Sequence, residues 1–334
     1  MFTKLTLFFL TFCTLTMRLF PEEIAHDLGL WSLKLLYLLG FKIPKKSTLD
    51  KTSLKGITFA NKLGLAAGLD KNGDYIDPLA SLGFGFLEIG TVTPRPQKGN
   101  PKPRLFRVSS QKALVNSLGF NNKGVDYLVE NISKRKSSIP LGISIGKNSD
   151  TPLEKAKDDY LICLEKVFPY ADYIAINISS PNTEGLRDLF NKEYFSDLIS
   201  SLKLKQIELS KEHKYVPLFL KISPNIDSSH LELLVEIILE KNIDGIICTN
   251  TSNVHDHISG KGGISGKPLL ELSSKVLVIL RSLVGKNFPI IASGGVMSVS
   301  DFQRKLDCGA DLVQIYTGLI YRGPSLVDEI INSD

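Results

Sequence analysis

The strongest constraint on the fold of this 334-residue chain is a set of eight short apolar segments between residues 63 and 318, each ending in Gly, Ser, Thr or Asn. Nearly continuous apolar strands indicate burial on both faces, as in a parallel sheet. Between several of these segments the apolar residues recur with helical periodicity, at 153–167, 231–239 and 269–283. Eight β-then-α units in about 270 residues predict an α/β fold, a (β/α)8 TIM barrel, with an open doubly wound sheet as the alternative. The segments are 63–68, 85–91, 140–146, 173–180, 217–223, 245–251, 289–295 and 312–318.

The first fifty residues differ from the rest and are predicted to form a separate helical extension (1–50) before the barrel (51–334). Pro21, Glu22 and Glu23 suit the start of a helix, because proline needs no hydrogen-bond partner there and acidic groups favour the helix dipole. An apolar stripe and three lysines follow. A wide apolar helix beside cations predicts contact with an anionic bilayer surface, and packing on the chain's own barrel is the alternative. The stripe is Ile24, Leu28, Trp31, Leu35 and Leu39.

Charge and cysteine content exclude other classes of protein. The net charge is +5, and the first 51 residues hold seven basic and four acidic residues, so the barrel is nearly neutral and no nucleic-acid partner is expected. The thirteen uncharged residues between Lys4 and Arg18 are fewer than the ~20 that a spanning helix needs. Four cysteines without a C-x-x-C pair argue against a disulfide framework or a structural zinc site.

Polar residues follow the predicted strands, where barrels of this type place their chemistry. Gly294-Gly295 and Tyr316-Thr317-Gly318 follow the seventh and eighth strands, where bare backbone N–H groups can cradle a phosphate. Amides are costly to bury without partners, so they indicate a polar ligand rich in hydrogen-bonding groups. These amides are Asn116, Asn177, Asn182 and Asn250.

Lysines rather than histidines stand at the strand ends. His255 and His257 lie in a loop and offer too few ligands for a metal site, so no metal is expected. Lys71 and Lys221 leave two enzyme classes open: one forms a Schiff base, and the other uses the ammonium to stabilise negative charge on a ligand or a flavin. A membrane-docked barrel without catalysis is the third interpretation.

At these residues the chain resembles the dihydroorotate dehydrogenases, specifically the quinone-dependent, membrane-associated class 2 enzymes, over roughly residues 20 to 332. Several ordered motifs carry the resemblance, which makes it specific. They include L-G-L-A-A-G-L-D-K (63–71), E-I-G-T-V-T-P-R-P-Q (88–97), N-S-L-G-F-N-N (116–122), Y-I-A-I-N-I-S-S-P-N-T (173–183) and V-Q-I-Y-T-G (313–318).

The resemblance implies an FMN-dependent oxidoreductase of pyrimidine (UMP) biosynthesis that oxidises (S)-dihydroorotate to orotate with a membrane quinone as electron acceptor. Ser180 matches the serine that removes the C5 proton, with a proton path past Thr183, while hydride passes from C6 to flavin N5. The matched cofactor-binding positions are Ala67, Gly68, Leu69, Asp70, Lys71, Thr91, Ser144, Asn177, Lys221, Thr249, Gly266, Gly295, Tyr316 and Thr317. The matched substrate-binding positions are Lys71, Asn116, Ser117, Leu118, Gly119, Phe120, Asn177, Asn182, Asn250 and Thr251.

Two positions depart from the family pattern. Ser144 stands where asparagine is usual, which puts that FMN or proton-relay contact in question. Ser117 replaces larger residues in the substrate loop and is expected to contribute its backbone only. By the same resemblance, the N-terminal helices form the quinone entrance and the bilayer contact. The chain is then predicted to be a monomer, peripheral to the cytoplasmic face of a bacterial inner membrane, with the mitochondrial inner membrane as the alternative.

Overall fold

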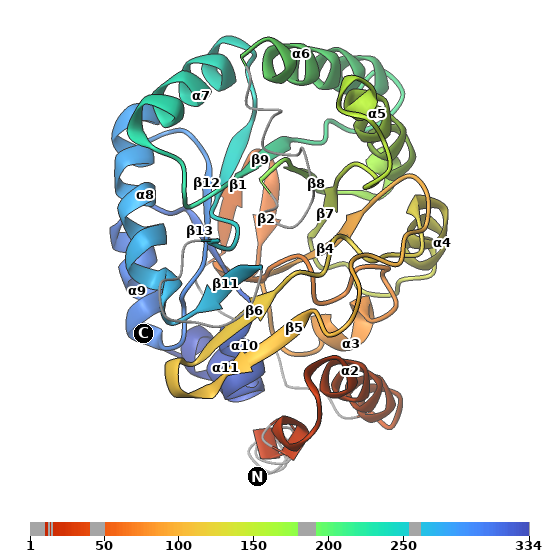
Figure 1. Ribbon diagram of the computed structural model, residues 1–334, viewed down its shortest axis with the longest axis vertical. Helices are drawn as coiled ribbons and strands as arrows, with labels where there is room; N and C mark the ends of the chain where they lie inside the picture. Colours follow the sequence, from red (N-terminus) through yellow and green to blue (C-terminus); the bar gives the residue numbers. More distant parts are fainter. Residues whose placement is uncertain are drawn as a thin grey trace.

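The computed structural model describes residues 11, 12, 14, 16–40, 51–179, 192–253 and 262–333. Eight parallel strands close into a barrel, with β13 pairing with β3 to complete the ring (Figure 1). Each strand overlaps one of the eight predicted segments, so the TIM barrel is confirmed and the open sheet is wrong. The strands are β3 (Leu63–Leu65), β4 (Phe86–Val92), β7 (Leu141–Ile145), β8 (Tyr173–Asn177), β9 (Leu218–Ile222), β10 (Gly245–Cys248), β12 (Ile290–Ser293) and β13 (Leu312–Ile315).

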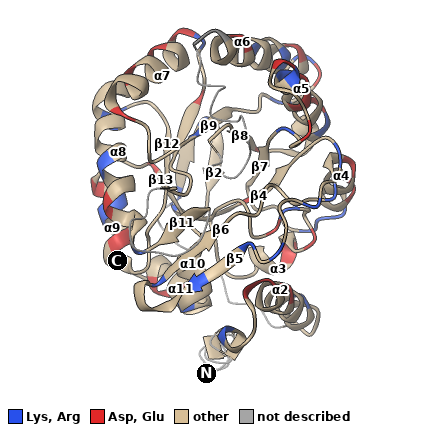
Figure 2. Cartoon of the chain, viewed as in Figure 1, with Lys and Arg blue, Asp and Glu red and all other residues tan. Residues whose placement is uncertain are grey.

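Helices surround the barrel, and most of the charged residues lie in these helices and in the loops rather than in the barrel strands (Figure 2). The three stretches predicted from periodicity are confirmed in α5, α7 and α8. Local sequence explains some of the starts: the Asp227 side chain accepts a hydrogen bond from the backbone of His230 and caps α7. The helices are α3 (Ile76–Ala80), α4 (Val125–Ser133), α5 (Ala156–Val167), α6 (Lys192–Leu209), α7 (Ser228–Glu240), α8 (Leu269–Val284), α9 (Val299–Asp307), α10 (Thr317–Arg322) and α11 (Pro324–Ile331).

Aromatic rings fill the amino-terminal end of the barrel. Phe86, Tyr173 and Phe219 lie at the beginnings of β4, β8 and β9 and contact one another edge to face. A Cβ on Gly64 would lie 2.2 Å from the Phe86 ring, so this glycine makes room for the aromatic layer. The hairpin β1 (Thr52–Leu54) and β2 (Ile57–Phe59) adds Phe59 to the cluster. Side chains therefore fill this end of the barrel, and a site inside the barrel lies at the carboxyl end of the strands.

The connections from β4 to β7 and from β10 to β12 are long, and they cover the carboxyl ends of the barrel strands. They supply β5 (Leu105–Val108), β6 (Ala113–Asn116) and β11 (Gly263–Gly266), which pair as a separate antiparallel sheet in the order β11-β6-β5. Residues of all three strands line the cavity at the carboxyl ends of the barrel strands.

Helix α2 (Glu22–Leu38) begins directly after Pro21, as predicted, and lies outside the ring beside α3 and β5 (Figure 1). Its inner side carries the buried Leu30 and two half-buried leucines that pack on the barrel core. Its outer side exposes the predicted stripe, including 59% of Trp31. The alternative of a helix packed on its own barrel is therefore correct for the inner side. No described helix has both the length and the apolar character to span a bilayer.

Candidate active site

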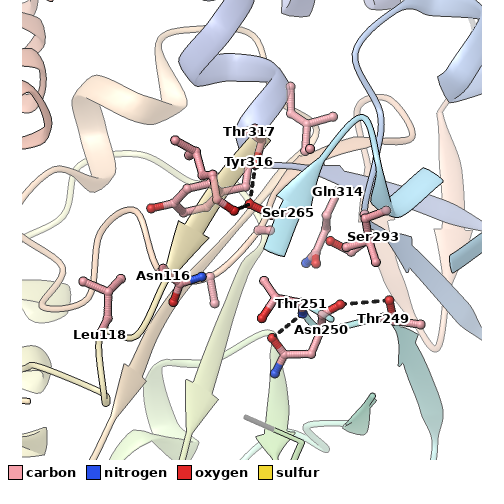
Figure 3. Close-up of a pocket in the computed structure, with 18 of the residues that line it drawn as sticks. Asn116, Leu118, Thr249, Asn250, Thr251, Ser265, Ser293, Gln314, Tyr316 and Thr317 are labelled. Carbon is pink, nitrogen blue, oxygen red and sulfur yellow. Dashed lines mark hydrogen bonds between the residues drawn. The ribbon is translucent and has the colours of Figure 1, made fainter. Parts of the chain in front are cut away.

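A cavity of about 1060 Å³, including its open mouth, lies at the carboxyl ends of the barrel strands. Figure 3 shows residues from the barrel strands facing residues of the covering sheet across it. Most of the predicted ligand-binding residues line this cavity: Ala67, Gly68, Lys71, Thr91, Asn116, Leu118, Gly119, Phe120, Asn177, Lys221, Thr249, Asn250, Thr251, Gly266, Gly295, Tyr316 and Thr317.

Four predicted residues that the structure describes lie elsewhere. Leu69 lines a second cavity, described below, and Asp70, Ser117 and Ser144 line neither. The predicted base Ser180 and the predicted substrate ligand Asn182 lie outside the described residues, together with Thr183, His255 and His257. Among the described residues, no three His, Cys, Asp or Glu side chains gather as a metal site.

A glycine cradle follows β12. Gly294 and Gly295 have φ angles of 108° and 89°, in the region that favours glycine. A Cβ on Gly295 would lie 2.3 Å from Leu270 Cα, so the loop can pass α8 only without a side chain. Nearby, Thr317 Oγ1 donates to Ser265 Oγ (2.8 Å; Figure 3). Bare backbone and hydroxyls in this place suit a phosphate.

A chain of amides and hydroxyls crosses the floor of the cavity. Asn177 Nδ2 donates to Thr91 Oγ1 (2.8 Å), and Asn250 Nδ2 donates to Asn177 Oδ1 (3.2 Å) and Ser179 Oγ (3.3 Å). Ser144 is fully buried behind Thr91, and their hydroxyls share a hydrogen bond of 2.8 Å. Ser144 thus supports a lining residue and does not line the cavity itself.

Lys71 lies in the loop after β3 and lines the cavity. Its Nζ donates to the Gly68 carbonyl (2.8 Å), and burial, with the nearby Arg104 guanidinium, lowers the pKa of Lys71 to about 8. Asp70 holds this loop, because its carboxylate accepts hydrogen bonds from the backbone N–H groups of Asn72, Asp74 and Tyr75. Burial raises the pKa of Asp70 to about 6, and these three donors oppose that rise.

Lys221 reaches the cavity from β9 and is ion-paired beneath it. Its Nζ lies 3.1 Å from Glu88 Oε1, and the Glu88 side chain is fully buried. Glu88 and the lining residues Gln314, Ser265 and Ser293 were not among the predicted site residues. A glutamate inside the apolar strand F-L-E-I-G was the available signal, because a buried charge is costly unless a partner compensates it.

A second cavity of about 1010 Å³ lies between α2 and the barrel. Leu33 and Leu36 of α2 line one side and Leu79 and Leu82 the other, while Arg18, Arg107 and His26 supply polar groups. Burial lowers the pKa of His26 to about 3, so this imidazole is neutral near pH 7. Leu105, Leu114 and Tyr316 line both cavities and form the wall between them.

Comparison with known proteins identifies this arrangement. A family model for dihydroorotate dehydrogenase matches residues 49–333. The chain belongs to the dihydroorotate dehydrogenase family. A protein from Shewanella sp. (strain MR-4), named dihydroorotate dehydrogenase (quinone), is 49% identical over 322 residues, which cover 94% of this chain and 95% of the relative. A relative of the same name from Shewanella frigidimarina is 49% identical and covers 92% of this chain and 94% of its own length.

Solved structures agree with the family. The DHODH of Eimeria tenella in complex with ferulenol superposes with a TM-score of 0.85 at 34% identity, covering 94% of this chain and 90% of that one. The ligand-free type of that enzyme gives a TM-score of 0.84 and covers 93% of each chain. The predicted dihydroorotate dehydrogenase family is therefore confirmed.

Membership of the dihydroorotate dehydrogenase family makes this chain an oxidoreductase and implies a flavin cofactor. The cavity fits such a group on its own features. The glycine cradle leaves room for a phosphate, Lys221 places a cation at the floor, and the buried Oε1 atom of Gln314 has no hydrogen-bond partner among the described residues. An unpaired buried acceptor is costly, which favours a ligand with hydrogen-bond donors.

Proposed function

We propose that the polar cavity at the strand ends holds FMN and dihydroorotate, and that the apolar cavity beneath α2 admits a membrane quinone. Family membership assigns the chain the oxidation of dihydroorotate to orotate with a quinone as acceptor, in pyrimidine biosynthesis. The observation that carries the assignment of the two sites is the shared wall of Leu105, Leu114 and Tyr316. It separates a site for a polar, anionic substrate from a site for a lipid.

The lining residues have complementary tasks. The glycine cradle and Thr317 would hold the FMN phosphate, and Lys221 would stabilise negative charge on the ring. Asn116, Asn177 and Asn250 can donate to the carbonyl groups of dihydroorotate and accept from its N–H groups. Lys71 can pair with the substrate carboxylate. FMN bound here would supply the acceptor for the hydride from C6 and the two-electron carrier to the quinone.

Ser180 is the proposed base that removes the proton from C5. A serine hydroxyl is a poor base at neutral pH, so it needs a path that carries its proton away, and Thr183 is the proposed first member of that path. The assignment is supported by the match of Y-I-A-I-N-I-S-S-P-N-T to the family pattern. Its local support is the amide chain ending at Ser179, whose Oγ donates to the Lys221 carbonyl (2.6 Å).

The N-terminal segment (1–50) is the proposed membrane and quinone-access unit. The outer side of α2 exposes 51% of Ile24, 59% of Trp31 and 71% of Leu38, which suits insertion among lipid headgroups. The chain would then be a monomer, peripheral to the cytoplasmic face of a bacterial inner membrane. Vesicle binding and sedimentation measurements test the last two points.

The visible absorption spectrum tests the proposed function. The purified protein should be yellow, lose its flavin absorption when dihydroorotate is added without oxygen, and regain it when a short-chain quinone follows. Acid release and chromatography should identify the flavin as FMN. A colourless protein that traps a carbonyl substrate after borohydride reduction would instead support the Schiff-base interpretation of Lys71 and Lys221.

A further inference from the structure

Four buried polar side chains meet below the floor of the cavity, contributed by four different barrel strands. Glu88 of β4 is their centre: its Oε1 accepts from Lys221 Nζ (3.1 Å), and its Oε2 accepts from Tyr173 OH (3.0 Å) and Gln314 Nε2 (2.7 Å). Gln314 Nε2 also donates to Tyr173 OH (3.1 Å). We call these four residues the Glu88 network.

The network surrounds the Glu88 carboxyl group with hydrogen-bond donors, one of which is the Lys221 amino group. Three donors converge on the two carboxylate oxygens, which is the environment of an ionised group rather than of a carboxylic acid. Burial and the adjacent Glu88 charge raise the pKa of Tyr173 well above its ordinary value, so its hydroxyl keeps its proton and stays a donor. Lys221 thus has a fixed counter-ion on the side away from the cavity.

The network also fixes the orientation of Gln314. Both described partners of its Nε2 atom, Glu88 and Tyr173, lie within the network, so the other atom of the amide group, Oε1, is turned away from them. That oxygen is buried and accepts no hydrogen bond from any described residue. Gln314 lines the cavity and pairs in register with Ser293, just before the glycine cradle (Figure 3). An oriented, unpaired acceptor at a cavity wall indicates a ligand donor.

We propose that Glu88 is a positioning residue for the flavin: its ion pair holds the Lys221 side chain beneath the ring, and its other oxygen turns Gln314 so that Oε1 accepts a hydrogen bond from an N–H or hydroxyl group of FMN. This inference rests on the proposed binding of FMN. Glu88 itself does not line the cavity, so it acts only through its two partners.

The test is the midpoint potential of the bound flavin in Glu88→Gln, compared with that of the wild-type protein. The substitution removes one negative charge and leaves the shape of the side chain, so the site becomes more positive and favours the reduced flavin anion. We expect the affinity for reduced over oxidised FMN to rise at least about tenfold, which equals about 30 mV for a two-electron couple. An unchanged potential would overturn the proposal.

Asp244→Asn is the matched control. Asp244 is also a buried carboxylate, 5% exposed, which lies 3.5 Å from Lys203 Nζ and accepts from the Leu218 backbone (2.9 Å), but it lies at the amino-terminal end of the barrel. The Asp244→Asn variant should have a lower melting temperature and an unchanged midpoint potential of the flavin. An equal shift of the potential in both variants would mean a general loss of packing and would contradict the positioning role.

Gln314→Leu tests the acceptor separately, and it serves if Glu88→Gln does not fold. Apoprotein of this variant should bind FMN about tenfold more weakly, the effect of one lost hydrogen bond in a buried site. Unchanged FMN affinity would overturn the role of Oε1. A wild-type protein that binds no flavin would instead refute the proposed function, so the two failures are distinguishable.

Discussion

The two cavities are nearly equal in size, about 1060 and 1010 Å³, but opposite in character. The first lies inside the barrel mouth and is lined by amides, hydroxyls, glycines and two lysines. The second lies outside the barrel under α2, and leucines dominate its lining. One therefore suits a polar anion and the other a lipid, although both use the same three residues as a common wall.

Under the proposed assignment, this difference keeps two substrates of opposite polarity in separate sites of one chain. Tyr316 belongs to the wall, and burial raises the pKa of its phenol to about 12, so it stays neutral between the two sites. In the proposed arrangement, electrons cross this shared wall, whereas the anionic substrate and the quinone stay on opposite sides of it. Variants that damage one cavity should therefore leave the half-reaction of the other intact.

The largest expected effect is confined to the polar cavity. In Ser180→Ala, reduction of the flavin by dihydroorotate should slow by about 100- to 10,000-fold at pH 7, because the proposed base is absent. Anaerobic stopped-flow absorbance measures this step. Flavin content and the reoxidation of chemically reduced enzyme by quinone should not change. A near-normal rate of flavin reduction in this variant would show that Ser180 is not the base.

The next effect concerns the glycine cradle of the same cavity. In Gly295→Ala the new Cβ would meet Leu270 Cα at 2.3 Å, so the loop must move away from α8, and FMN affinity should fall about 100-fold, or about 3 kcal/mol. Gly285→Ala is the matched control, because Gly285 also has a positive φ of 75° but open space around it. Gly285→Ala should lower the free energy of unfolding by about 1 kcal/mol and leave the affinity for FMN unchanged. Equal flavin loss in both would argue against the cradle.

A smaller effect should appear in the apolar cavity alone. A Cβ on Gly29 of α2 meets nothing within 4 Å, and this residue lines the cavity. In Gly29→Trp the indole should fill space that the quinone needs and raise the KM for quinone about tenfold or more, with flavin reduction unchanged. Gly29→Ala should gain about 1 kcal/mol of helix stability and keep the wild-type KM. Slower flavin reduction in the tryptophan variant would break the separation of the two sites.

The pH dependence should also separate the cavities. Lys71 is charged below its pKa of about 8, so the dissociation constant of orotate should be flat below pH 8 and rise up to about tenfold per unit above it. The pKa values of His26 and Tyr316, about 3 and about 12, lie outside this range. The KM for a short-chain quinone should therefore stay constant from pH 7 to 9. Titration of the flavin spectrum with orotate checks the first statement, and steady-state assays check the second.

The smallest expected effect is on the membrane. Trp31→Glu should weaken binding to anionic vesicles several-fold, because it removes the largest apolar side chain from the exposed stripe, and should leave the rate with a short-chain quinone unchanged. Ile207→Glu is the control, since Ile207 is 56% exposed on α6, across the barrel. Equal loss of vesicle binding in both variants would contradict a role specific to α2.

The strands and most of the lining residues were predictable from the sequence because their signals are local. Each apolar run overlaps a strand, and strand ends such as Asn177 and Lys221 lie where the barrel rule places them. The position of Ser144 was not predictable, because only packing shows that Thr91 stands between it and the cavity. Nor did the stripe on α2 reveal that its opposite side, with Leu30, packs on the barrel core.

The sequence by itself determined the eight-stranded barrel, the polar strand ends and the resemblance to a family, since burial, periodicity and motif order are carried by neighbouring residues. Only the tertiary structure decided which distant groups meet. Glu88 and Gln314 are 226 residues apart and bond because β13 closes the ring onto β3, next to β4. The common wall of the two cavities arises in the same way, from β5, β6 and the loop after β13. Closure of the barrel brings its first and last strands together, and no local sequence pattern encodes that contact.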